Sequence, residues 1–335
     1  MRAWASIVGV AVALATLPAQ AQQKVRFALD WILQGPQATF LRAAESGCFA
    51  REKLDVVIDR GFGSGDTVTK VAAGNYDVGF ADLNVVMEFN ARSTGPKALA
   101  VFVMHDASSA SVLTLASSGI AAPKDLIGKR IAAPTGDASR RLFPILAKTA
   151  GLDPAAVIWQ NISPELREPM LARGEVDAIT GLTYTGIMSL VAVGVPADHI
   201  RTLKYADYGA DLYGHAVIVN PAFAAANGPA ITSLIRCTAE AMREELVKPE
   251  LTIAALKKRD PLVSEAIELE RLKLSIACCW VTPNTRANGF SAVAEPRLVN
   301  SIRTVADAFG FAPLPPDEVY SARYLPPRDA LALGL

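Results

Sequence analysis

The sequence has 335 residues, in which 33 lysines and arginines balance 33 aspartates and glutamates. This length allows two domains, because a single hydrophobic core stops growing near roughly 250 residues. The balanced charge excludes the strongly basic composition that binds nucleic acid or anionic membranes, so we expect no nucleic-acid partner.

The N-terminus has the three parts of a secretory signal peptide. Arg2 supplies the positive charge, an apolar stretch runs from Ile7 to Leu17, and Ala19-Gln20-Ala21 has the A-x-A cleavage pattern. The apolar stretch is too short to span a bilayer, and no later stretch has the apolar length of a transmembrane helix. Residues 1–21 are therefore predicted to direct export, most simply to a periplasm. Because no cysteine lies at the cleavage site, no lipid anchor is expected.

The first strand predicted after the signal peptide leads into a candidate site. Val25 to Leu29 is a short apolar run of the length expected for a buried strand. It ends at Asp30 and Trp31, and Gln34 follows in a loop. Ligands of open α/β sheets bind at the carboxyl ends of strands. Asp30 offers a hydrogen-bond acceptor beside the flat face of Trp31, which suits a small planar polar ligand; alternatively, Trp31 caps the core and Asp30 belongs to a turn.

A glycine-rich turn follows the second predicted strand, Leu54 to Ile58. The turn contains Gly63 and Ser64 and leads into a helix, where backbone N–H groups can hold an anion or another acceptor. A plain tight turn with Asp66 capping the helix is the alternative. The third predicted strand ends near Asp82, which is a further candidate for ligand binding.

The same plan recurs later in the chain. The segment GKRIAAPTGDASRRLFPIL gives a strand, a small-residue turn containing Thr135 and Gly136, and a helix. Likewise, LARGEVDAITGLT repeats VAAGNYDVGFADL, in which a helix end, a glycine and an aspartate precede a short strand, and Tyr184 follows this second copy. The repetition predicts two lobes of like construction, each with a parallel sheet whose loops face one side. Thr135, Gly136 and Tyr184 are accordingly candidate ligand-binding residues.

Two segments are predicted to cross between the lobes. Residues 111–115 are predicted to form a strand that leaves the first lobe, and residues 213–219 one that returns to it. The chain after the return is mostly helical in its periodicity. We therefore predict an α/β fold whose first lobe comprises residues 22–112 and 217–335 and whose second lobe comprises residues 113–216. A two-strand hinge of this kind permits closure around a ligand.

Neither the cysteines nor the histidines have the spacing of a metal site. Cys278 and Cys279 are adjacent, without a second cysteine pair or a histidine at ligand spacing. In an oxidising compartment one disulfide can form, for example between Cys237 and Cys278 or Cys279, although the sequence leaves the connectivity open. The scattered histidines are interpreted as surface or core residues: His105, His199 and His215. No metal and no cofactor are predicted.

Four ordered segments carry a resemblance to a known family. They are ALDWILQGPQA at residues 28–38, GCFAREKLDV at 47–56, GSGDTVTKVAAGNYDVGFAD at 63–82, and DLIGKRIAAP at 125–134. In their order and spacing the chain resembles the NMT1/THI5-like and taurine/nitrate-type solute-binding proteins of ABC importers. The resemblance implies a two-lobed type II periplasmic-binding-protein fold with the ligand between the lobes. The family includes binders of thiamine pyrimidine precursors, flavins, sulfonates and nitrate.

The resemblance also implies roles for the Asp-Trp pair, which is shared with the pyrimidine-binding branch. Trp31 would stack on a heterocycle, and Asp30 would orient it or bond an exocyclic amine. The chain departs from that branch directly afterwards, having Ile32-Leu33-Gln34-Gly35-Pro36 in place of an Asn- and His-containing stretch. An aromatic loop near the return crossing offers Tyr208 or Tyr213 to close over the ligand; the alternative is that both are surface residues.

The sequence therefore predicts a monomeric periplasmic solute-binding protein that delivers a small planar polar solute to an inner-membrane ABC permease. The predicted solute is a pyrimidine thiamine precursor or similar heterocycle, with a sulfonate, nitrate or another small anion as an alternative. A second alternative is an enzyme resembling thiamine pyrimidine synthase. However, no histidine falls near the opening loop, and Cys278-Cys279-Trp280 is too short for the Cys-rich motif of that enzyme. No catalytic residue is predicted.

Overall fold

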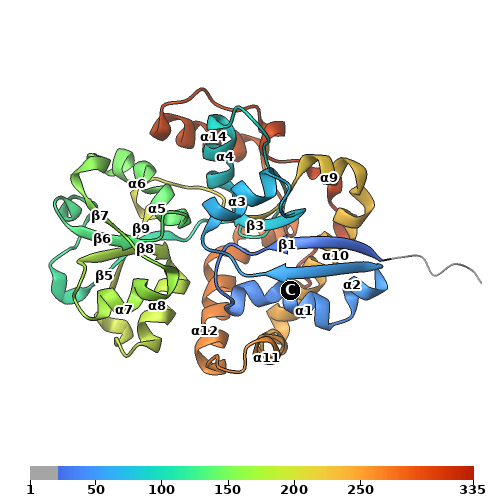
Figure 1. Cartoon of the computed structure of the whole chain (residues 1–335), viewed down its shortest axis with the longest axis horizontal. Coiled ribbons are helices and arrows are strands. Elements are labelled where there is room, and N and C mark those ends of the chain that lie inside the picture. Colours follow the sequence, from blue (N-terminus) through green and yellow to red (C-terminus); the bar gives the residue numbers. More distant parts are fainter. Residues whose placement is uncertain (1–21) are drawn as a thin grey trace, which may run out of the picture.

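Two five-stranded sheets form the centres of two lobes, which lie side by side in the computed structural model of residues 22–335 (Figure 1). The predicted signal peptide, residues 1–21, lies outside the described residues. The two-lobed α/β architecture predicted from the sequence is confirmed, and the repeated sequence plan corresponds to the two sheets.

The first sheet has the strand order β2-β1-β3-β10-β4. Its strands are β1 (Gln23–Ala28), β2 (Leu54–Asp59), β3 (Val78–Asp82), β4 (Leu99–Val103) and β10 (His215–Val219). Strand β1 runs parallel to β2 and β3, whereas β10 is antiparallel to both of its neighbours. The prediction of a wholly parallel sheet is therefore wrong, because β10 returns from the second lobe and enters the sheet from the opposite end.

The second sheet repeats this arrangement with the order β7-β6-β8-β5-β9. Its strands are β5 (Ala110–Leu115), β6 (Arg130–Ala133), β7 (Ile158–Asn161), β8 (Ala178–Leu182) and β9 (Ile200–Lys204). Strand β6 is parallel to β7 and β8, and β5 is antiparallel to β8 and β9. Each sheet thus contains one strand, β5 or β10, that the chain enters directly from the other lobe.

Helices flank both sheets (Figure 1), so the central strands β3 and β8 are buried along their whole length. The first-lobe helices are α1 (Ala38–Glu45), α2 (Cys48–Arg51), α3 (Ser64–Ala72), α4 (Leu83–Arg92), α9 (Pro221–Ala226), α10 (Gly228–Val247), α11 (Pro249–Arg259), α12 (Glu265–Ser275), α13 (Pro283–Asn288) and α14 (Glu295–Phe309). The second-lobe helices are α5 (Ala138–Arg141), α6 (Phe143–Ala150), α7 (Arg167–Ala172) and α8 (Thr183–Ala192). In the first-lobe core, the ring of Phe40 lies 4.6 Å from that of Phe27 and 5.2 Å from that of Phe80.

Two crossing segments join the lobes. The first, residues 104–109, connects β4 to β5, and the return crossing segment, residues 205–214, connects β9 to β10. They run side by side, since the N–H of Ser108 donates to the carbonyl oxygen of Leu212 at 2.9 Å. Strands β5 and β10 each belong to a single sheet, so each crossing lies just before the strand predicted to make it. Two first-lobe helices also contact the second lobe: α12 packs against α8, and α14 packs against α6.

All four cysteines form disulfides. Cys48 of α2 is bonded to Cys237 of α10, and Cys278 is bonded to its neighbour Cys279. The predicted pairing of Cys237 with Cys278 or Cys279 is therefore wrong, because helix packing places α2 against α10. The sequence contains no signal for that proximity.

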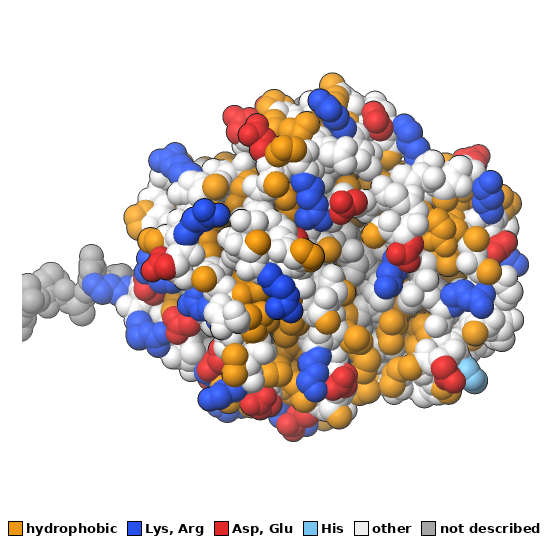
Figure 2. Space-filling view, turned by 180° about the vertical axis from the view of Figure 1, so that it is seen from behind, with side chains coloured by type: hydrophobic (Ala, Val, Ile, Leu, Met, Phe, Trp, Pro, Cys, Tyr) orange, Lys and Arg blue, Asp and Glu red, His pale blue; other side chains and the backbone are white. Residues whose placement is uncertain are grey.

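The surface carries interspersed acidic and basic side chains with hydrophobic groups between them, as the face in Figure 2 shows. Among residues 22–335, no helix has both the length and the apolar character needed to cross a membrane. The mixture of both charges on this face agrees with the balanced composition of the sequence.

Candidate functional site

The loop after β1 is held against the glycine-rich turn before α3 by two backbone hydrogen bonds. Gly61 donates its N–H to the carbonyl oxygen of Trp31 at 2.9 Å, and Gly63 donates to that of Asp30 at 2.7 Å. A Cβ on Gly61 would lie 2.0 Å from the carbonyl oxygen of Leu29, so this close approach requires glycine. The pairing fixes Asp30 and Trp31 at the carboxyl edge of the first sheet.

The second lobe brings an ion-paired arginine to the same region. Arg167, the first residue of α7, is buried and pairs with Asp137 at 3.0 Å and with Glu168 at 2.7 Å. Asp137 also accepts a hydrogen bond from the hydroxyl of Thr180 at 2.9 Å. Burial acts to lower the pKa of Arg167, but the two carboxylates outweigh it and raise the pKa, so the guanidinium stays charged.

These elements enclose a small cavity between the lobes. Its lining residues are Asp30, Trp31, Gln37, Gly63, Ser64 and His215 from the first lobe and Asp137, Ala138, Arg167, Leu182 and Thr185 from the second. About 20 Å³ is open to the centre of a water molecule, which is room for a single water. The guanidinium carbon of Arg167 lies 4.5 Å from the centre of the Trp31 ring, and Trp31 is only 6 % exposed. The lobes are therefore closed, with a planar cation of the second lobe over the indole of the first.

His215, at the start of β10, lies between two carboxylates of the first lobe. Its Nε2 is 3.1 Å from Oδ2 of Asp30, and its Nδ1 is 3.7 Å from Oδ2 of Asp82. Burial acts to lower the pKa of His215, but the hydrogen bond and charge of Asp30, together with Asp82, raise it overall. Burial raises the pKa of Asp82, and His215 opposes that effect. The carboxylates of Asp30 and Asp82 thus favour the protonated form of His215 on the acidic side of the cavity.

A serine also lies near this histidine. Ser64 Oγ is 3.3 Å from Nε2 of His215, and the same oxygen accepts a hydrogen bond from the N–H of Asp82 at 3.0 Å. In serine hydrolases the histidine takes the serine proton, which requires a neutral imidazole. Here Asp30 binds the same nitrogen and favours the charged form, so the contacts describe Ser64 as a polar lining group rather than an activated nucleophile.

Gln37 leaves a hydrogen-bond acceptor free at the cavity. Its Nε2 donates to Oδ1 of Asp30 at 3.1 Å, while its Oε1 is buried without a partner among residues 22–335. A buried acceptor without a donor is unfavourable by about 1–3 kcal/mol. A ligand that carries an N–H or O–H donor would satisfy this oxygen.

Contacts between the lobes close the cavity at separate points. A Cβ on Gly63 would lie 2.3 Å from backbone atoms of Gly136, so the two glycines touch without room for a side chain. The N–H of Gly65 donates to the carbonyl oxygen of Gly136 at 3.0 Å. Elsewhere, Arg271 of α12 donates to the carbonyl oxygen of Thr185 in α8 at 2.7 Å. These contacts depend on closure, because each joins one lobe to the other.

The residues selected from the sequence occupy different places around this cavity. Four of them line it: Asp30, Trp31, Gly63 and Ser64. Asp82 lies behind His215, and Gly136 touches Gly63 at the edge. Gln34 and Tyr184 are buried beyond the lining, with the Tyr184 ring 6.1 Å from that of His105. The structure therefore brings most of the predicted set to one region, at different depths.

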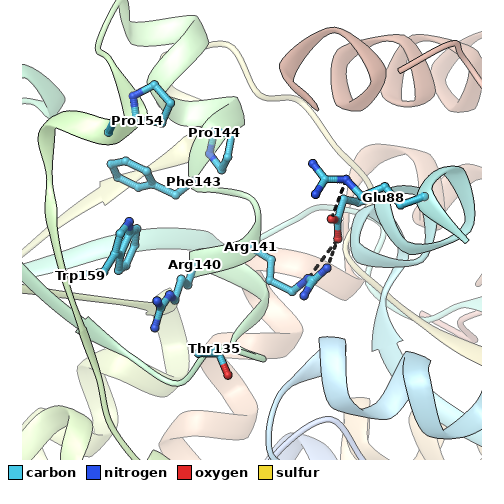
Figure 3. Close-up of a pocket in the computed structure, with 10 residues that line it drawn as sticks. Glu88, Thr135, Arg140, Arg141, Phe143, Pro144, Pro154 and Trp159 are labelled. Atoms are coloured by element: carbon cyan, nitrogen blue, oxygen red, sulfur yellow. Dashed lines mark hydrogen bonds and ion pairs between the residues drawn. The ribbon is translucent and has the colours of Figure 1, made fainter. Parts of the chain in front are cut away.

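Thr135 lies outside the cavity, in an open groove of about 450 Å³ between α4 and the start of α6 (Figure 3). In this groove the guanidinium carbon of Arg140 is 4.8 Å from the centre of the Trp159 ring. Arg141 reaches across from the second lobe and pairs with Glu88 of α4. The groove is thus another region in which the two closed lobes meet.

Two predicted tyrosines lie away from the cavity. Tyr213 is buried, and its hydroxyl accepts a hydrogen bond from the N–H of Ala294 at 3.0 Å. Its ring is covered by the guanidinium of Arg297, whose carbon is 4.1 Å from the ring centre. Tyr208 packs against a hydrophobic core rather than the cavity. The structure does not bring either tyrosine over Trp31.

Several lining residues were not selected from the sequence: Gln37, Asp137, Ala138, Arg167, Leu182, Thr185 and His215. One had a usable sequence signal: Asp137 ends the small-residue turn after β6. His215 had none, because its place beside Asp82 follows from the antiparallel register of β10. Arg167 had none, since a single arginine at a helix start is common. No cluster of three or more potential metal ligands occurs within residues 22–335.

Comparison with known proteins identifies the family of the chain. The family model described as NMT1/THI5 like matches residues 36–251, which is more than half of the chain. The chain belongs to the NMT1/THI5-like family. No curated protein is significantly similar to it in sequence.

Solved structures similar to this NMT1/THI5-like chain share its fold at low sequence identity. The alkanesulfonate-binding protein SsuA from Xanthomonas axonopodis pv. citri, bound to MOPS, has a TM-score of 0.67 and 18% identity over 94% of this chain and 99% of that one. The aliphatic sulphonate binding protein SsuA from Escherichia coli has a TM-score of 0.65 and 17% identity, covering 87% and 88%. The nitrate-binding protein NrtA from Synechocystis PCC 6803 has a TM-score of 0.62 and 13% identity, covering 93% and 88%. These similarities establish the periplasmic-binding-protein fold.

Proposed function

We propose that this chain is the solute-binding component of an ABC importer, which captures a small planar solute between its lobes and presents it to an inner-membrane permease. The observation that carries the proposal is the approach of two planar groups from opposite lobes, the Trp31 indole and the Arg167 guanidinium, across the closed cavity. A flat solute inserted between them would stack on both. Export by residues 1–21 and a periplasmic location are part of this proposal.

The cavity is too small for a solute in its present closed form. Entry therefore requires the lobes to separate, and closure around the solute requires tighter binding to the closed form than to the open one. Contacts with both Trp31 and Arg167 exist only when the lobes approach each other. A solute that bridges the two supplies this difference in affinity.

The charges around the cavity favour a neutral or cationic nitrogen heterocycle over an anion. Arg167 is already paired with Asp137 and Glu168, and His215 is already paired with Asp30. An anion would have to draw these cations away and leave buried carboxylates unpaired, which is unfavourable by about 3–5 kcal/mol per broken pair. An amino group on a heterocycle would instead satisfy the free Gln37 oxygen.

The paired charges of the cavity therefore favour a solute of a different class from the sulfonates and nitrate bound by the structural neighbours. The proposed solute is a heterocycle such as an aminopyrimidine, and binding of a small anion instead is one outcome of the test. No reaction is assigned, because the His215 nitrogen that lies 3.3 Å from the Ser64 hydroxyl is also bound by Asp30, which favours the protonated imidazole.

The test is a thermal-shift screen of the mature protein with an aminopyrimidine, a flavin, an alkanesulfonate, nitrate and a carboxylate. We expect stabilisation by a nitrogen heterocycle, quenching of tryptophan fluorescence, and no turnover. Trp31→Ala should abolish the response, whereas Trp159→Ala, in the outer groove, is the matched control and should retain it. Stabilisation by the sulfonate or nitrate alone would refute the assigned solute class, and an unchanged response in Trp31→Ala would refute the stacking site.

A further inference from the structure

The disulfide between Cys278 and Cys279 joins adjacent residues at the end of α12. Cys278 is exposed, Cys279 is fully buried, and the buried Trp280 follows directly. Successive side chains of an α-helix point about 100° apart, so a bond between neighbouring sulfurs does not fit regular α-helical geometry. The chain here forms a π-helical turn, residues Ile276–Trp280, and such turns occur frequently at functional sites.

This bond does not connect distant parts of the chain. The Cys48–Cys237 disulfide spans a sequence separation of 189 residues and so restricts the unfolded chain strongly, whereas the separation of Cys278 and Cys279 is 1. A bond between neighbours closes no loop of the unfolded chain. Its effect must therefore be local, on the shape of the turn that carries it.

The turn is fastened to the first crossing segment. The carbonyl oxygen of Cys279 accepts a hydrogen bond from the N–H of Ala107 at 3.2 Å. Just beyond the turn, the hydroxyl of Thr282 donates to Oδ2 of Asp106 at 2.6 Å, and Asn284 donates to the other carboxylate oxygen at 2.7 Å. The turn and the start of α13 thus hold two successive residues of the segment that joins the lobes.

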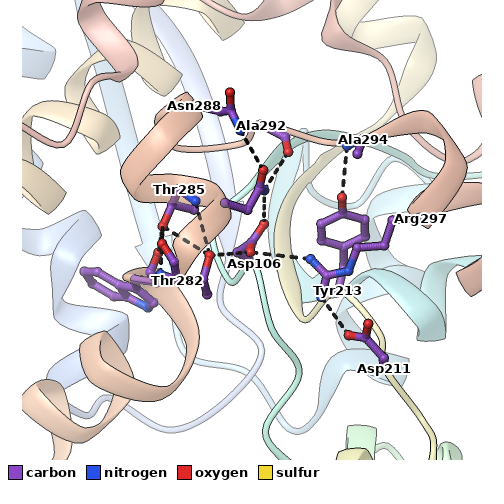
Figure 4. A network of polar contacts seen from close by, with 11 residues as sticks. Asp106, Asp211, Tyr213, Thr282, Thr285, Asn288, Ala292, Ala294 and Arg297 are labelled. Carbon is purple, nitrogen blue, oxygen red and sulfur yellow. Dashed lines mark hydrogen bonds and ion pairs between the residues drawn. The ribbon is translucent and has the colours of Figure 1, made fainter.

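An arginine extends these contacts to the return crossing segment (Figure 4). Arg297 of α14 lies 3.4 Å from Asp106 and 2.9 Å from Asp211, one residue in each crossing segment. On the other side of the turn, Arg271 of α12 bonds the Thr185 carbonyl oxygen in the second lobe. A change in the turn is therefore connected to both crossing segments and, through α12, to a contact made only in the closed state.

We propose that Cys278–Cys279 is a redox-sensitive site that controls how readily the lobes close, and hence, if the proposed function holds, the affinity for solute. The reductant is a dithiol, either a small molecule or a protein of the thioredoxin class. One thiolate of the reductant attacks the exposed Cys278 sulfur and breaks the bond to Cys279. The second thiol then releases Cys278, so the pair gains two electrons and two protons while the reductant becomes a disulfide.

The first test measures thiols and amide hydrogen exchange on the full mature chain without any solute. Mild dithiol treatment should expose two thiols, at Cys278 and Cys279, while the buried Cys48–Cys237 bond remains closed. Exchange in residues 104–109 should then become roughly threefold faster or more. The double variant Cys278→Ser/Cys279→Ser should show the fast exchange without reductant. Unchanged exchange after reduction and in the double variant, or opening of Cys48–Cys237 first, would overturn the proposal.

The second test measures affinity for the solute identified by the screen, before and after reduction. We expect a several-fold change in the wild-type chain and none in the double serine variant. A constant affinity with altered exchange would limit the switch to motion of the crossing segments and overturn its effect on solute. Because hydrogen exchange needs no solute, failure of the transport proposal would leave the first test intact.

Discussion

Removal of the Cys48–Cys237 disulfide is expected to destabilise the first lobe strongly. The bond joins α2 to α10 across a sequence separation of 189 residues, which includes the whole of the second lobe. For a loop of this length, the chain-entropy relation gives roughly 5 kcal/mol of stabilisation through the unfolded state. Both cysteines are buried, so replacement by alanine also loses a small amount of packing.

The perturbation is the double variant Cys48→Ala/Cys237→Ala, and the matched control is Cys278→Ser/Cys279→Ser. Urea unfolding should be followed both by tryptophan fluorescence and by far-UV circular dichroism, because two lobes need not unfold as one unit. We expect the first variant to lose about 2–5 kcal/mol of unfolding free energy. The control should lose less, about 1–2 kcal/mol, because its bond closes no loop and only the serine hydroxyl at the fully buried position 279 is unfavourable.

The two variants together test whether loop closure explains the stabilisation by the Cys48–Cys237 disulfide. A loss below about 1 kcal/mol in the first variant would contradict the loop-closure argument. A large loss in the control would show that the adjacent disulfide supports folding, and would remove the reason for assigning it a local role. Mass spectrometry of the intact proteins would confirm that the remaining disulfide is formed in each variant.

Two further predictions concern pH and closure. Glu245, which accepts hydrogen bonds from Thr39 and Thr252, has its pKa raised by burial to about 8. Between about pH 4.5 and 8 the folded state therefore keeps a proton on Glu245 that the unfolded state has lost. As the pH rises through this range, the free energy of unfolding falls by up to about 1.4 kcal/mol per pH unit. Glu245→Gln should flatten that slope in urea unfolding at about pH 5 and about pH 8; an unchanged slope would contradict the raised pKa. Gly136→Val should widen the molecule in small-angle X-ray scattering, because in the closed form a Cβ at this position already lies 3.1 Å from the carbonyl oxygen of Phe62 in the first lobe. Gly95→Val should not, because a Cβ there has no atom within 4 Å. Equal dimensions in both would show that the Gly63–Gly136 contact does not limit closure.

The fold could be predicted from the sequence because its signals are local and repeated. Apolar runs gave the central strands, and the paired segments that end in DVGFADL and DAITGLT became β3 and β8, which occupy equivalent positions in the two sheets. The direction of β10 could not be predicted in this way. A strand carries no sequence mark for parallel or antiparallel pairing, and its direction here follows from the return of the chain between lobes.

The cavity could be predicted only where one lobe contributes a continuous segment. Asp30 and Trp31 follow a strand, and Gly63 and Ser64 begin a helix, so general rules for sheet edges select them. The closing partner, Arg167, comes from a helix far along the chain, and its position depends on how the lobes approach each other. The sequence also does not show whether an aromatic side chain such as Tyr213 packs in the core or contacts a ligand, and in the structure Tyr213 is buried in the core.

The distribution of buried charge explains how a cavity this polar can open. Arg167 and its carboxylate partners all belong to the second lobe, and His215 and its partners all belong to the first. Separation of the lobes therefore breaks neither set, and the buried Glu88, which loses its pair with Arg141, keeps its pair with Arg92 of the first lobe. Opening removes the approach of Arg167 to Trp31, worth about 0.5–2 kcal/mol, and partly exposed pairs such as Arg60–Glu165, worth about 0–1 kcal/mol. It also removes the hydrogen bonds of Arg271 to Thr185 and of Gly65 to Gly136, each worth about 0.5–3 kcal/mol. The difference between open and closed forms is thus small enough for a bound solute to decide it.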